Sequence, residues 1–102
     1  MNSMMFAAVL AVSIFASASA ATSVPLKGAQ YLPQTKISLA RARSIALAKE
    51  RGTILDQELE REATGSGLRY SFDIKIGAVV HEVGVDAVTG RVLEDTIDNG
   101  ND

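Results

Sequence analysis

The alternation of apolar and polar side chains between residues 53 and 85 is the feature that most restricts the fold of this chain. It is clearest in LRYSFDIKI, residues 68–76, where every second side chain is apolar: Leu68, Tyr70, Phe72, Ile74 and Ile76. Weaker alternation precedes it in TILDQELERE and follows it in the valines after residue 78. A period of two is typical of strands that bury one face, so the sequence predicts three strands with a common apolar side.

The turn between the first two strands is assigned to residues 65–66, a glycine followed by a serine. A two-residue loop at this point places Leu59 opposite Phe72 and Leu55 opposite Ile76. Those four side chains then share one face of the sheet.

The next turn is assigned to residues 77–78, because glycine suits the first position of a type II′ turn. This loop places Phe72 opposite Val83 and Tyr70 opposite Val85. Both turns put the same residues on one side, which predicts an antiparallel meander.

Residues 37–52, ISLARARSIALAKERG, change to a helical period, with apolar side chains at Leu39, Ala42, Ile45 and Ala46. Ser38 is a suitable N-cap, and Gly52 is expected to take the left-handed conformation after the helix. A fourth strand, residues 91–95, follows a turn in which Gly90 needs a positive φ. We therefore expect an α+β fold, with one amphipathic helix packed on a three- to four-stranded antiparallel meander sheet.

Residues 1–20 have the composition of a cleaved secretory signal, with an apolar run and small residues at Ala18 and Ala20. An uncleaved anchor is the alternative, although the apolar run is shorter than a membrane-spanning helix. The expected location is the periplasm or the medium, with no stable membrane anchor after cleavage. Residues 21–36 are assigned to a linker or extended arm, residues 37–97 to the domain, and residues 98–102 to a polar tail.

Catalytic chemistry has little support, because His81 is the only histidine and the chain has no cysteine. In the expected register His81 lies opposite Ile74 on the apolar face, whereas Ser71 and Asp73 point to the other face. A Ser/His/Asp arrangement therefore fails, and one imidazole without thiolates disfavours zinc. We expect no catalytic residues, metal ligands or cofactor. The net charge of −2 likewise gives no reason to expect nucleic acid or an anionic membrane as partner.

Three acidic residues stand out, because the expected register places Glu58, Asp73 and Glu82 side by side on the outer face. Like charges in adjacent strands repel, which leaves three explanations. The carboxylates are solvated, the register differs, or they meet a cation or a basic partner. In the last case they form a docking patch or a weak calcium site.

The order of these parts resembles the PepSY domain, a module of metallopeptidase propeptides and of small exported proteins. The resemblance lies in ISLARARSIALA, YSFDIKI and HEVGVDAVTGRVLED, and covers about residues 37–96. Two departures from the family habit are Ala40–Arg41, where acids are common, and His81, where an aromatic residue is frequent. The resemblance implies a restraining or modulating role toward peptidases and brings no catalytic motif.

We therefore expect a non-catalytic binding module that contacts another protein, with a peptidase as the leading class of partner. The alternative is an envelope structural or stress protein that binds a metal ion or a small ligand through its acidic sheet face. The sequence leaves the oligomeric state open.

Overall fold

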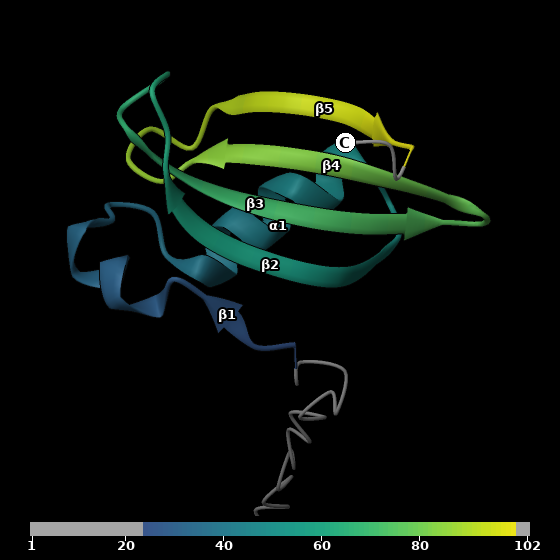
Figure 1. The fold of residues 1–102 in the computed structure, drawn as a ribbon, viewed down its shortest axis with the longest axis horizontal. Helices are drawn as coiled ribbons and strands as arrows, with labels where there is room; N and C mark the ends of the chain where they lie inside the picture. The colour runs from purple at the N-terminus through teal and green to yellow at the C-terminus, as the bar shows by residue number, and fades with distance from the viewer. Residues whose placement is uncertain (1–23, 100–102) are drawn as a thin grey trace, which may run out of the picture.

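The computed structural model describes residues 24–99, so the expected signal segment, residues 1–20, and residues 100–102 lie outside the described part. Its elements follow the order β1 (Leu26–Lys27), η2 (Ala29–Gln34), α1 (Leu39–Lys49), β2 (Thr53–Arg61), β3 (Leu68–Ile76), β4 (Val79–Asp86) and β5 (Val92–Asp98). The strands form one sheet in sequence order, and α1 lies against one of its faces (Figure 1). Within residues 24–99 no helix is both long and apolar enough to cross a membrane.

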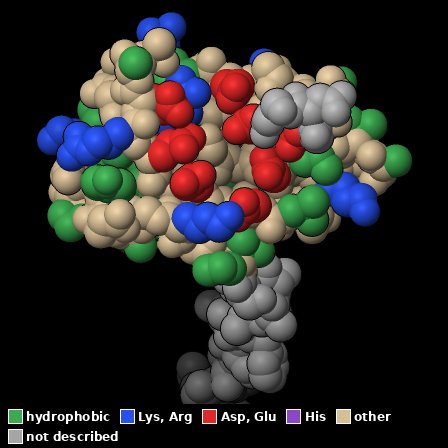
Figure 2. Space-filling view, in the orientation of Figure 1, with side chains coloured by type: hydrophobic (Ala, Val, Ile, Leu, Met, Phe, Trp, Pro, Cys, Tyr) green, Lys and Arg blue, Asp and Glu red, His purple; other side chains and the backbone are tan. Residues whose placement is uncertain are grey.

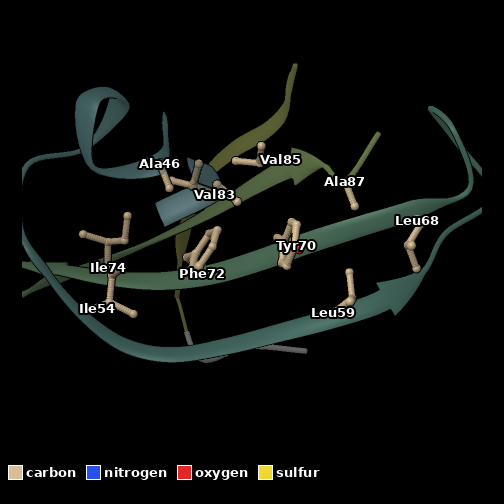
Figure 3. Close-up of a cluster of buried hydrophobic side chains, with 11 residues drawn as sticks. Ala46, Ile54, Leu59, Leu68, Tyr70, Phe72, Ile74, Val83, Val85 and Ala87 are labelled. Carbon is tan, nitrogen blue, oxygen red and sulfur yellow. The ribbon is translucent and has the colours of Figure 1, made fainter. Parts of the chain in front are cut away.

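The core lies between α1 and the sheet, and on β3 and β4 it has the composition that the alternation predicts (Figure 3). Ala42 and Ala46 of α1 have no exposed surface, and small side chains let the helix approach the strands closely. Beneath them lie the fully buried side chains of the central strands: Tyr70, Phe72, Ile74, Val83 and Val85. The Tyr70 hydroxyl donates to the Ile37 carbonyl at 2.8 Å, which ties β3 to the segment before α1.

The start of α1 agrees with the sequence, whereas its end does not. Ser38 caps the helix by accepting a hydrogen bond from the Arg41 amide at 3.1 Å. Gly52, however, is absent from the glycines with positive φ, and the C-cap Glu50 is extended. The expectation of a left-handed Gly52 was wrong. Glycine is needed there because a Cβ would fall on the Lys75 carbonyl oxygen of β3.

The register between β3 and β4 is confirmed. Phe72 pairs with Val83 and Tyr70 with Val85. Gly77 has a φ of 61°, and no residue other than glycine has a positive φ in the described chain. The tight turn at residues 77–78 therefore has the backbone signs of type II′.

The register between β2 and β3 differs from the prediction by two residues. Leu59 pairs with Tyr70, and Gln57 takes the place opposite Phe72. A bulge between Ile54 and Asp56 then reverses the alternation, so that Ile54 is 8% exposed and Leu55 is 49% exposed. The prediction that Leu55 faces inward was wrong.

The cause of the shift is a longer loop, residues 62–67, held by the buried carboxylate of Asp86. This carboxylate accepts the Ser66 amide at 2.7 Å. It also accepts the amides of Val88 and Thr89, both at 2.9 Å. One side chain thus joins the β2–β3 loop to the β4–β5 turn, and a two-residue loop could not reach it.

Over the described residues 24–99 the sheet has five strands. It is mixed, because β1 pairs in parallel with β2. The segment expected to be a linker or arm therefore supplies a strand and a 3-10 helix. The side chain of Gln57 holds the segment before β1 against β2 and α1. Its nitrogen donates to the Val24 carbonyl at 2.8 Å, and its oxygen accepts from Arg43 of α1 at 2.8 Å. At the other edge, β5 continues to Asp98, beyond the residues expected for the fourth strand.

Candidate functional site

The outer face of the sheet, the face turned away from α1, carries a concentration of carboxylates (Figure 2). They come from the four strands β2 to β5, and the alternation of side chains along each strand places them on this face. We call this set the acidic face: Asp56, Glu58, Glu60, Asp73, Glu82, Glu94 and Asp98.

The three carboxylates singled out in the sequence all lie on the acidic face, but not as one straight row. Asp73 pairs with Glu82 as expected, whereas Asp56 and not Glu58 pairs with Asp73. Glu58 lies opposite Ser71, because the register of β2 is displaced. A small polar cavity of about 60 Å³ nevertheless brings together Asp56, Glu58, Ser71, Asp73 and Glu82.

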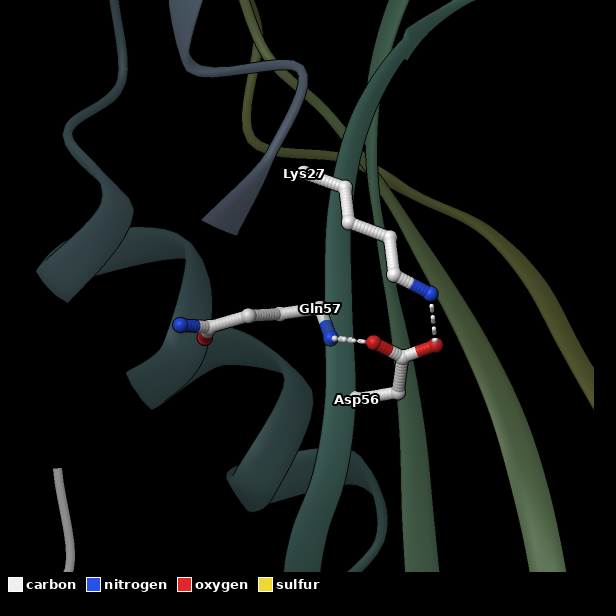
Figure 4. A network of polar contacts seen from close by, with 3 residues as sticks. All are labelled: Lys27, Asp56 and Gln57. Carbon is white, nitrogen blue, oxygen red and sulfur yellow. Dashed lines mark hydrogen bonds and ion pairs between the residues drawn. The ribbon is translucent and has the colours of Figure 1, made fainter. Parts of the chain in front are cut away.

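Lys27 and Ser71 make polar contacts with carboxylates around this cavity. Lys27 of β1 donates to Asp56 at 3.0 Å. The other oxygen of the same carboxylate accepts a hydrogen bond from the backbone amide of Gln57 at 3.0 Å (Figure 4). Ser71 donates to Glu60 at 2.9 Å. Lys27 and Asp56 are both well exposed, so their ion pair adds little to stability.

Burial and mutual repulsion raise the pKa of two carboxylates of the acidic face, Asp73 and Glu82. Burial, followed by the charges of Asp56 and Asp98, raises the pKa of Asp73. Burial, followed by the charges of Glu94 and Asp73, raises the pKa of Glu82. A raised carboxyl pKa means that ionisation weakens the fold. The penalty is absent below the ordinary pKa, grows as the pH rises through the window up to the raised pKa, and is complete above it.

We expect carbon-detected NMR titration to place the Asp73 and Glu82 carboxyl midpoints above their ordinary values. Asp56→Asn should lower the midpoint of Asp73 more than that of Glu82, because Asp56 is the direct strand partner of Asp73. Glu94→Gln is the matched control and should lower the midpoint of Glu82 more than that of Asp73. Midpoints that ignore both substitutions would contradict the repulsion described here.

A second group of ionisable side chains lies on the helix side of the sheet. His81 pairs with Ile74 as expected, and its side chain is half-buried. Its Nδ1 lies 3.5 Å from Oε1 of Glu50, the C-cap of α1. Asp95 of β5 completes a group whose ligand atoms all lie within 4.8 Å of one another. Sequence reasoning found His81 but missed Glu50 and Asp95, which reach it from a helix end and a neighbouring strand.

Comparison with known proteins identifies a family. No curated protein and no solved structure matches the chain. The family model for the peptidase propeptide and YPEB domain, PepSY, matches residues 36–96. PepSY domains are propeptide-like modules that are generally non-catalytic and occur in exported proteins. Since the match covers more than half of the chain and spans α1, strands β2 to β4 and β5 as far as Thr96, this protein belongs to the PepSY family.

Proposed function

We propose that this protein is an exported, non-catalytic binding module that modulates a peptidase by placing its acidic face against a basic surface. The observation that carries the proposal is the gathering of seven carboxylates from four strands on one side of the sheet. The propeptide-like family supports the class of partner. The signal-like residues 1–20 support export to the periplasm or the medium.

The energetics of the acidic face favour a cationic partner. Like charges in register across neighbouring strands are destabilising. Burial first, and repulsion from neighbouring carboxylates second, raises the pKa of Asp73 and of Glu82, so ionising either group costs free energy in the folded chain. Lysine and arginine side chains of a partner would relieve this cost on contact. Opposed charges also speed association and select against acidic surfaces.

A direct test uses the processed chain with a panel of secreted metallopeptidases. We expect reduced peptidase activity with at least one, and an inhibition constant that weakens as salt screens the charges. Asp73→Asn combined with Glu82→Gln should weaken inhibition by about tenfold, which corresponds to about 1.4 kcal/mol.

A matched control adds two positive charges elsewhere: Ala40→Lys combined with Ala48→Lys, two exposed positions on α1. This variant has the same net charge as the neutralised one but keeps the acidic face. It should inhibit like the native chain. Equal weakening of both variants would show that only net charge matters, and no inhibition across the panel would remove the peptidase from the proposal.

A calcium site is the second candidate function, favoured by the cavity of about 60 Å³ on the acidic face. Calcium prefers carboxylate and hydroxyl oxygens, and the lining supplies four carboxylates and the Ser71 hydroxyl. Binding would appear as shifts of the β2, β3 and β4 amides during a calcium titration. An unchanged spectrum at millimolar calcium excludes this candidate and leaves protein docking in place.

A further inference from the structure

We propose that Glu50, His81 and Asp95 form a binding site for a divalent transition-metal cation of the zinc type. The three residues come from the end of α1, from β4 and from β5, and they lie on the helix side of the sheet. The site is therefore separate from the acidic face and does not depend on the proposed docking function.

The placement of the three ligands follows from the register of β4 and β5. His81 pairs with Ile97, and Val83 pairs with Asp95, so His81 and Asp95 have the same strand parity. Glu50, the C-cap of α1, lies beside this pair, with its Oε1 3.5 Å from Nδ1 of His81. The side chains of Glu50 and His81 are 22% and 19% exposed, which holds two of the three ligands in a restricted space.

The spacing fits a shared cation better than a direct contact. A hydrogen bond between a charged imidazole and a carboxylate is about 2.7–2.9 Å long. The observed separation of Nδ1 and Oε1 is 3.5 Å. Two ligands bound to tetrahedral zinc at about 2.0–2.1 Å lie about 3.4 Å apart. The Glu50–His81 pair is thus separated by the distance that two neighbouring zinc ligands require.

The donor set selects the class of metal. An imidazole nitrogen suits zinc, copper or nickel, whereas calcium and magnesium prefer oxygen alone. The two carboxylates balance the charge of a divalent cation, and the carbonyl end of α1 adds negative potential beside Glu50. Because Asp95 is exposed, a fourth coordination position can face solvent and take a water molecule or a group from a partner.

The test is a calorimetric titration of the metal-free processed protein with zinc chloride at pH 7.5, followed by amide NMR. We expect one zinc ion per chain and the largest shifts at residue 50 and in β4 and β5. His81→Gln should weaken zinc binding at least tenfold, and Asp95→Asn should weaken it severalfold. Calcium should leave the signals of His81 unchanged.

Glu62→Gln is the matched control, since it removes one carboxylate from the loop at the other end of β2 and should leave zinc affinity unchanged. Thermal unfolding of each metal-free variant verifies that it folds. The proposal is overturned by the absence of binding at millimolar zinc. It is equally overturned by native zinc affinity in both His81→Gln and Asp95→Asn, which would show that zinc binds outside this group. Peptidase inhibition is measured separately, so failure of either proposal leaves the other intact.

Discussion

Replacing Asp86 with alanine is expected to lower the free energy of unfolding by about 4 kcal/mol, a large share of the stability of a domain this small. Asp86 is 1% exposed, and its carboxylate is the acceptor for three backbone amides, those of Ser66, Val88 and Thr89. Alanine would leave these donors without their partner and release the β2–β3 loop from the β4–β5 turn. Urea denaturation at pH 7 measures the change.

Asp86→Asn separates charge from shape, because an amide keeps one accepting oxygen. We expect a loss of about 2 kcal/mol, between the native chain and the alanine variant. Denaturation of the alanine variant at the native urea midpoint would show that the loop and the turn do not depend on this carboxylate. Glu62→Gln, in the same loop but without these contacts, controls for the removal of a negative charge.

Protonation of Asp86 lowers the free energy of unfolding, whereas protonation of Asp73 on the acidic face raises it. Burial alone would raise the pKa of Asp86, but hydrogen bonds from Ser66, Thr89 and Val88 outweigh it and hold that pKa well below its usual range. Its contribution is complete above the ordinary carboxyl pKa of about 4 and is lost as the pH falls through the lowered value. Protonating Asp73 instead removes the cost of burying its charge and its repulsion from Asp56. As the pH falls, the penalty at Asp73 is therefore relieved before the Asp86 contribution is lost.

The parts of the fold that could be predicted from sequence are those fixed by nearby residues. Ser38 lies three residues from the amide that it caps, and the turn at residues 77–78 directly joins the strands that it aligns. A two-residue loop leaves little freedom in the register, so assigning the turn was enough to predict that Phe72 pairs with Val83. The family resemblance pointed to the same helix and strands, and the match over residues 36–96 agrees.

The parts that were missed are set by contacts distant in sequence. Gln57 is buried in place of an apolar residue because its side chain bonds to Val24 and Arg43, which lie 33 and 14 residues away. The loop at residues 62–67 closes on Asp86, 20 residues from Ser66. The alternation of apolar and polar residues carries no information about partners so far away in the sequence. The register of β2 and the role of β1 were therefore not predicted.

The grouping around His81 was hidden by a second irregularity. Continuing the pairing of Val85 with Val92 without interruption would place residue 96 opposite His81. The register shift between Gly84 and Val85 adds one residue, so that Ile97 takes that position and Asp95 shares the face of His81. The extra residue is Leu93 of β5, opposite the step from Gly84 to Val85. Glycine within an alternating strand often accompanies such an irregularity, but Gly84 gave no indication of which strand carries it.

Replacing Gly52 with alanine is expected to lower the free energy of unfolding by about 3 kcal/mol. The added Cβ would meet the Lys75 carbonyl oxygen. It would also lie 2.7 Å from Cγ1 of Ile76 and 2.9 Å from Cγ2 of Ile74. Because the nearest atom belongs to the backbone of β3, a rotamer change cannot remove the clash, and the chain between α1 and β2 must move away from the sheet.

Gly77→Ala is the matched control, since both variants add one methyl group next to β3. Nothing lies within 4 Å of a Cβ at Gly77, so only its positive φ of 61° opposes alanine, at about 1 kcal/mol. Thermal or urea unfolding should therefore show that Gly52→Ala is much less stable than Gly77→Ala. The reverse order would mean that Gly52 serves through backbone freedom, as its sequence position first indicated, and that α1 does not approach β3 as closely as described.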